Sequence, residues 1–365
     1  KAFFEDGGSS EGVGYWQYGL APYVIFADLL YNRTNGKINL FENNKLKKIA
    51  GYPLALMLSK NAYAPFADSR ENTTFIPGFI YKLAQRTCVP ELRGVLDNIQ
   101  NFAGRQSRLT YHLRDILWTK DSSDEMVPPL KISASYLPDL GVARIVNASS
   151  AVVIKAGNNA ENHNHNDIGT YVYNVSGETV ITDPGVGSYN RDYFGPKRYE
   201  NLFTNSYSHP VPVIDGKLQQ PGIKHIGQFV TVDLPNNKVV IEYSAAYGIP
   251  ELQKLERELV LLSNGINLTS RYSFTDKNIH VLEEAFVTYN EMEIRAGKLV
   301  ITGERTMTEI QCCTVLSIPV VLIVNKYEDE SKQNGYNKVL KRGAFKFGGI
   351  QKVVELRFSV MVNVL

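Results

Sequence analysis

Apolar residues recur every three or four positions through the first third of the chain, and that spacing predicts α-helices. The predicted helices cover residues 12–30, 44–58, 79–84, 89–102 and 113–118. Pro53 lies inside the second of them and is expected to break it. The connecting loops are rich in Asn, Gly and Pro, and no strict repeat period is present. This pattern favours a helical repeat or toroid over a compact bundle.

Beyond about residue 130 the apolar period changes to two, which predicts β-strands. The predicted strands cover residues 142–146, 151–155, 168–175, 179–182, 211–214, 229–232, 238–244, 255–262, 265–274, 281–288, 298–302, part of 314–326, and 353–364. A polar stretch that ends in Pro128-Pro129 separates the two patterns. Because helices precede strands instead of alternating with them, we expect an α+β multidomain chain. Residues 1–125 form its helical domain, and residues 126–365 form a large antiparallel β-sandwich of about a dozen strands.

Composition narrows the function classes. The 365 residues carry a net charge of +2, which argues against a nucleic-acid binder that works through bulk charge. The three cysteines, Cys88 and the adjacent Cys312 and Cys313, give no disulfide framework and are expected to be reduced and buried. No stretch of the sequence is long and apolar enough to span a membrane.

The chemistry concentrates between residues 157 and 189. His163, His165 and Asp167 are spaced by two, so an extended segment places all three on one side. Imidazoles and a carboxylate that converge beside a hairpin suit a divalent metal, most naturally zinc, and a free imidazole suits proton transfer. The alternative is a polar loop whose side chains bond their own backbone. Asp183 and the later His209 favour the metal.

The hairpin sets a geometric condition on that site. A two-residue turn at Ser176-Gly177 pairs Asp183 opposite Thr170 and not opposite His165. The loop before the first strand of the hairpin therefore has to curl back for His165 and Asp183 to share an ion.

A second cluster, acidic, aromatic and rich in glycine, lies at residues 6–19. Its glycines do not have the spacing of a phosphate-binding loop. Tyr15, Trp16 and Tyr18 gather beside Glu11 where the first helix begins. They predict either a helix entry with stapling aromatic residues or the wall of a sugar groove that carries a tyrosine acid.

Four motifs in this order resemble the heparinase II/III-like polysaccharide lyases, which include heparin, heparan sulfate and alginate-type lyases. They are Asp-Gly-Gly-x-x-Glu-Gly-x-x-Tyr-Trp-x-Tyr-Gly at 6–19, His-Asn-His-Asn-Asp-x-Gly at 163–169, Gly-x-x-x-x-x-Asp-Pro-Gly at 177–185, and Ser-His-Pro-Val-Pro-Val-Ile-Asp-Gly-x-x-Gln at 208–219. The resemblance implies the C-terminal part of an incomplete α/α toroid followed by a β-sandwich, with the substrate cleft between them.

The resemblance also implies the site residues. A structural, organising Zn²⁺ would be held by His165, Asp183 and His209, and catalysis would use Tyr18 with His163 nearby. We expect the substrate to be bound by Glu11, Tyr15, Trp16, Arg191 and Tyr199, although a solvated loop is the alternative for the last two. The family's carboxylate-neutralising Asn or His has no match here, so the N-terminal half is expected to be missing or separate, or the chain to be inactive alone.

The expected activity is β-elimination on a uronic-acid polymer, with a glycosaminoglycan such as heparin or heparan sulfate favoured. The alternatives are an alginate or oligoalginate lyase and a catalytically silent carbohydrate-binding relative. A zinc hydrolase is disfavoured because no His-Glu-x-x-His motif is present. The expected partners are an anionic polysaccharide or oligosaccharide, with a homodimer as an option, and the resemblance implies a periplasmic or secreted bacterial protein.

Overall fold

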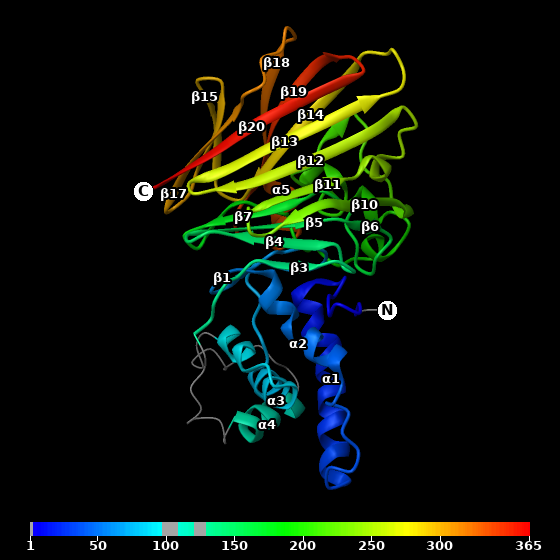
Figure 1. The fold of residues 1–365 in the computed structure, drawn as a ribbon, viewed down its shortest axis with the longest axis vertical. Coiled ribbons are helices and arrows are strands. Elements are labelled where there is room, and N and C mark those ends of the chain that lie inside the picture. The colour runs from blue at the N-terminus through cyan, green and yellow to red at the C-terminus, as the bar shows by residue number, and fades with distance from the viewer. Residues whose placement is uncertain (1–2, 97–108, 120–128) are drawn as a thin grey trace.

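A computed structural model describes residues 3–96, 109–119 and 129–365, and it is mostly β-sheet with few helices (Figure 1). Most of the helices gather at one end and most of the strands at the other. The α-helices of the first part are α1 Gly12–Arg33, α2 Asn44–Leu56, α3 Pro77–Thr87 and α4 Leu109–Thr119. A 3₁₀-helix, η1 Pro90–Val95, begins the segment predicted as a helix over 89–102, and the end of that segment lies outside the described residues. The predicted domain border near residue 125 also lies outside them.

Helix α1 buries a stripe of apolar side chains at helical spacing, and α2 runs through Pro53 without a break. Proline has no N–H, so the carbonyl of Ile49, four residues earlier, loses its helical partner. The indole Nε1–H of Trp16 donates to that carbonyl at 2.7 Å. The prediction that Pro53 breaks the helix is therefore wrong, because a tertiary hydrogen bond replaces the missing one.

Two short strands, β1 Met57–Ser59 and β2 Ala62–Tyr63, form a hairpin inside the helical part. Residues 129–365 form three antiparallel sheets and not the two of a simple sandwich. The five-stranded sheet has the order β3-β4-β5-β7-β8, with β3 Ser135–Leu137, β4 Val142–Val146, β5 Ser150–Lys155, β7 Tyr171–Val175 and β8 Glu178–Ile181.

The nine-stranded sheet has the order β15-β16-β17-β20-β13-β12-β11-β10-β6, with β6 Gly157–Asn159, β10 Gly222–Asp233, β11 Lys238–Glu242, β12 Leu252–Leu262, β13 Gly265–Phe274, β15 Glu291–Arg295, β16 Lys298–Thr302, β17 Thr306–Cys312 and β20 Val353–Val364. The four-stranded sheet has the order β18-β19-β14-β9, with β9 Val213–Ile214, β14 His280–Thr288, β18 Val320–Tyr327 and β19 Leu340–Ile350. A short helix, α5 Glu328–Gln333, connects β18 to β19.

The five-stranded sheet lies between the helices and the other two sheets, and β5 shows this most directly. All six of its residues are buried. Ala151 and Val153 belong to the core cluster of the helical part, whereas Val152 and Ile154 belong to the core between the sheets. Since successive strand residues point to opposite faces, each face of the sheet closes a different core. The helical and β parts therefore share a packed boundary, and residues from both reach the same loops.

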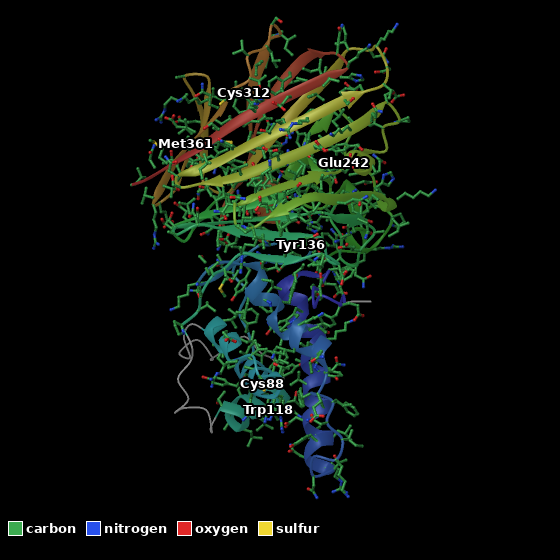
Figure 2. All side chains as sticks on the ribbon, in the orientation of Figure 1. Cys88, Trp118, Tyr136, Glu242, Cys312 and Met361 are labelled. Carbon is green, nitrogen blue, oxygen red and sulfur yellow. The ribbon has the colours of Figure 1, made fainter. Side chains whose placement is uncertain are left out.

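The cysteines correct one expectation of the sequence. All three are free, but Cys88 and Cys313 are exposed and Cys312 is half-buried. Cys88 lies in the helical part and Cys312 in the β part (Figure 2). Among the described residues, no helix is long and apolar enough to cross a membrane.

Candidate functional site

The β7–β8 hairpin turns where the sequence predicts it. Ser176 and Gly177 both have positive φ angles, 49° and 84°, and Val175 pairs with Glu178. A bulge shifts the register by one residue farther along the hairpin, yet the Thr170 hydroxyl still donates to Asp183 Oδ2 at 3.0 Å. The predicted strand register, with Asp183 directly opposite Thr170, is therefore off by one residue, although a side-chain hydrogen bond joins the two. The loop before the hairpin still has to bring His165 to Asp183.

That loop does curl back, and it builds a buried group of three side chains. His165, Asp183 and His209 each offer one ligand atom within 4.8 Å of the others. His209 Nδ1 lies 2.7 Å from Asp183 Oδ2, and all three side chains are buried. The two imidazoles and one carboxylate are ligand types that zinc takes, and they come from three segments of the β part.

The local hydrogen bonding fits a metal at these residues. His165 Nε2 faces Asp68 Oδ1 at 3.1 Å, whereas its buried Nδ1 has no hydrogen-bond partner. Burial lowers the pKa of His165, although the nearby Asp68 carboxylate opposes this shift. The lowered pKa keeps the ring neutral at pH 7. A neutral imidazole with one nitrogen held by a carboxylate and the other left as a lone pair is the arrangement of a histidine ligand.

The regular spacing of His163, His165 and Asp167 does not place these three around one ion. His163 has a φ of 57°, so the segment is not extended and the alternation of sides fails there. Asp167 Oδ1 instead accepts a hydrogen bond from Lys155 Nζ at 2.5 Å in a buried ion pair.

Asp68, which the sequence reasoning missed, connects the group to the helical part. Its carboxylate accepts from His163 Nδ1 at 2.5 Å and from His165 Nε2 at 3.1 Å. The hydroxyl of Tyr193 and the guanidinium of Arg198 also donate to Oδ1, at 2.5 and 3.1 Å. Burial alone would raise the pKa of Asp68, but the two histidines and the charge of Arg198 bring that pKa well below its usual value. Asp68 is therefore a carboxylate that holds both histidines.

His163 has the geometry of a general base. Because its Nδ1 donates to the Asp68 carboxylate, Nε2 carries the lone pair. The imidazole stacks on the ring of Tyr15 at a centroid distance of 4.3 Å, and its side chain is 22% exposed. Solvent can thus reach the ring of His163, whereas that of His165 is buried.

Aromatic rings surround His163 on the surface. Tyr18 is 61% exposed and meets Tyr15 edge-on at a centroid distance of 6.0 Å. The Tyr15 and Tyr189 hydroxyls lie 2.7 Å apart, and the exposed Phe194 meets both Tyr189 and His163 edge-on. Tyr18 and His163 therefore contact the same ring, Tyr15, from a helix and from a loop of the β part. These rings form an aromatic surface that suits the flat faces of sugars.

The other residues predicted to bind substrate differ in how exposed they are. Trp16 is fully buried against Ile49, so the prediction that it lines a sugar groove is wrong. Glu11 lies at the surface, where it accepts from Asn162 Nδ2 at 3.2 Å, next to His163. Arg191 is exposed. Tyr199 is half-buried, with its hydroxyl 3.5 Å from Asn164 Nδ2.

Two cavities of about 700 and 720 Å³ adjoin this region. The first is lined by Phe4, Glu161 and Asn162 among others, and the second reaches Asp183 from the side of Tyr336. Tyr18 and His163 line neither cavity. That they flank one sugar ring in a common cleft stays a prediction.

Comparison with known structures shows the fold. The chain matches heparan sulfate lyase HepC from Pedobacter heparinus with a TM-score of 0.71 at 15% identity, over 100% of this chain and 54% of that one. A structure of heparinase III matches with a TM-score of 0.69 at 14% identity, over 100% and 55%. The Streptomyces coelicolor A3 chondroitin AC lyase, in complex with chondroitin sulphate, matches with a TM-score of 0.54 at 9% identity, over 98% and 54%. The chain thus spans about half the length of these structures.

Comparison of sequences addresses the family. A search of curated proteins gives no match. The family model described as "Heparinase II/III-like, C-terminal" matches residues 131–277, a range that contains His163 and all three candidate metal ligands. Residues 131–277 are thus similar to the C-terminal part of the heparinase II/III-like family, and the whole chain has the fold of the heparan sulfate lyase and heparinase III structures.

Proposed function

We propose that this protein is a polysaccharide lyase that cleaves uronic-acid-containing polysaccharides by β-elimination. The observation that carries the proposal is the Asp68–His163 pair, which leaves Nε2 of an accessible imidazole as a base beside Tyr15 and Tyr18. A base and an acid on the same surface are what an elimination needs. The family and the lyase structures of the same fold support this reaction class.

In the proposed reaction His163 Nε2 takes the proton from C5 of the uronic acid, and the C4–O4 bond breaks. The departing O4 receives a proton from the Tyr18 hydroxyl, and a double bond forms between C4 and C5. The C5 proton is weakly acidic, so the substrate carboxylate has to be neutralised as charge develops. Arg191 is exposed and lies in the chain between Asp183 and His209, and its cationic side chain can approach that carboxylate. Glu11, Tyr15 and Tyr199 would bind neighbouring sugar groups.

A Zn²⁺ ion on His165, Asp183 and His209 would supply structural order, not the reacting group, because these ligands are buried beneath the surface that carries His163. Its effect on the reaction would pass through Asp68, which holds His165 and His163 with its two oxygens. The metal site would thereby fix the orientation of the base.

A glycosaminoglycan such as heparin or heparan sulfate is the favoured substrate, supported by the two similar structures named heparan sulfate lyase and heparinase III. We propose a periplasmic or secreted place in a bacterium on the same resemblance. An alginate or oligoalginate lyase and a silent carbohydrate-binding relative remain the competing functions.

Elimination leaves a conjugated double bond in the sugar product. The test is therefore to incubate the full-length protein with heparan sulfate, heparin or alginate and to follow the ultraviolet absorbance of the mixture. Absorbance that rises with the glycosaminoglycans, and that is lost in His163→Ala, is the expected result. A rise with alginate alone would assign the alginate activity. Binding of these polymers without any absorbance change would overturn the lyase in favour of the binding protein.

A further inference from the structure

A buried arginine contacts two of the segments that carry the candidate metal ligands. Arg257 is on β12 of the nine-stranded sheet, and its side chain is fully buried. NH2 donates to Glu284 Oε2 on β14 at 2.8 Å, and Glu284 Oε1 accepts from the Tyr272 hydroxyl at 2.5 Å. NH1 donates to two backbone carbonyls, Gly169 at 2.9 Å and Pro210 at 2.6 Å. The charge is thus paired, and NH1 reaches two loops, whereas the buried Nε has no hydrogen-bond partner.

The two carbonyls belong to the segments that carry the metal ligands. Pro210 follows His209 directly in the chain. Gly169 precedes Thr170, whose hydroxyl donates to Asp183 Oδ2, and it ends the loop that carries His165. One guanidinium nitrogen therefore joins the loop of His165 to the segment of His209, which are far apart in sequence.

The residues around Arg257 pack closely against the segments that it bonds. Gly169 has a φ of 88°, and a Cβ there would lie 2.8 Å from the ring of Tyr243, so the chain approaches as closely as glycine allows. The rings of Tyr171 and Tyr243 lie 5.7 and 5.8 Å from the guanidinium carbon. A planar fork with several donors fits two carbonyls and a carboxylate at once, which the single ammonium of lysine does not.

We propose that Arg257, held by Glu284, is a positioning residue for the metal site: it fixes the distance between the His165 loop and His209 and so preorganises the ligands for zinc. This inference rests on the proposed zinc site. Partners that orient metal ligands typically change metal affinity by about 10- to 100-fold when they are removed.

The test is the zinc dissociation constant of the full-length protein, measured by competition with a chelator, together with the melting temperature of the metal-free protein. Arg257→Lys should weaken zinc binding by about 10- to 100-fold. The matched control is Arg271→Lys on the neighbouring strand β13, where the arginine pairs with Glu355 and Glu258 at the surface. The control should bind zinc as the wild type does.

A folded Arg257→Lys protein with wild-type zinc affinity would overturn the inference, even if its metal-free melting temperature fell, because that fall alone marks a purely structural role. If Arg257→Lys does not fold, Tyr272→Phe loosens Glu284 while leaving the arginine in place, and it should weaken zinc binding several-fold. Wild-type affinity in that variant would then count against the inference. A wild type that binds no zinc would instead overturn the metal site itself.

Discussion

Replacing Asp68 by asparagine should reverse the hydrogen bond through which we propose that His163 becomes a base. Asp68 Oδ1 accepts from His165, Tyr193 and Arg198, whereas Oδ2 faces His163 Nδ1 alone among these donors. The asparagine carbonyl should therefore take the place of Oδ1, and its amide group should take the place of Oδ2. The amide donates, so His163 Nδ1 becomes the acceptor and the ring proton moves to Nε2. Nε2, the proposed base, then has no lone pair to take a proton.

The magnitude follows from these contacts. Loss of a positioned proton-transfer group costs about 10²- to 10⁴-fold in rate, and a histidine held in the wrong tautomer by such an Asp→Asn change lies near the upper end. Zinc should stay bound, because His165 Nε2 still has a carbonyl to donate to. Stability should fall by about 1–2 kcal/mol, since Arg198 loses a charged acceptor but keeps the carbonyls of Asn164 and Tyr193.

The assay is the initial rate of ultraviolet absorbance on a uronate polymer, with zinc content and melting temperature measured on the same preparations. Asp192→Asn makes the same chemical change on an exposed side chain of the neighbouring segment and should leave all three unchanged. A zinc-loaded, folded Asp68→Asn protein whose rate stays within about threefold of wild type would refute the role of Asp68.

Three further outcomes are expected. Tyr18→Phe removes the hydroxyl of a side chain that is 61% exposed and should cut elimination by at least about 100-fold with little change in melting temperature, whereas near-normal turnover would exclude Tyr18 as the acid. Elemental analysis should find no zinc in His165→Ala, and this variant should melt at a lower temperature than the wild type. A chelator should lower the melting temperature of the wild type to the same value. Equal stability with and without metal would contradict the zinc site. His280 lies between Asp215 and Asp276, and although burial lowers its pKa, the two carboxylates raise it above its usual value. The contribution of His280 to stability should therefore be present below about pH 6.5 and be lost as the pH rises through the raised pKa. Urea unfolding should show that His280→Asn is less stable than the wild type at acid pH and close to it at alkaline pH. A difference that does not depend on pH would contradict this.

Most of the helices and strands could be predicted from local patterns of apolar residues, because the period of each element is a local property. Strands β4, β13, β16 and β20 have the bounds that the period of two predicts, and α1 to α4 each begin near a predicted helix. Strands β15, β17 and β19 lie in segments for which no strand was predicted. β17 and β19 pair on one side with the distant strands β20 and β14, whereas the edge strand β15 pairs with β16, its neighbour in the chain. The hairpin turn at Ser176-Gly177 was also local, since positive φ angles in a two-residue turn are a property of the turn itself.

The site divides in the same way. Motif order supplied His165, Asp183 and His209, and the structure brings the three together. Asp68 carried no signal, because it reaches His163 and His165 across 95 and 97 residues of chain.

Trp16 shows the reverse case, in which a residue inside a functional motif serves the core. Helical spacing placed it on a face of α1, but spacing does not tell which face a second element covers. Only the fold brings α2 against that face and supplies the Ile49 carbonyl that Pro53 leaves without a partner. Local periodicity thus fixed which residues share a side of an element, and tertiary packing decided which side became core and which became site.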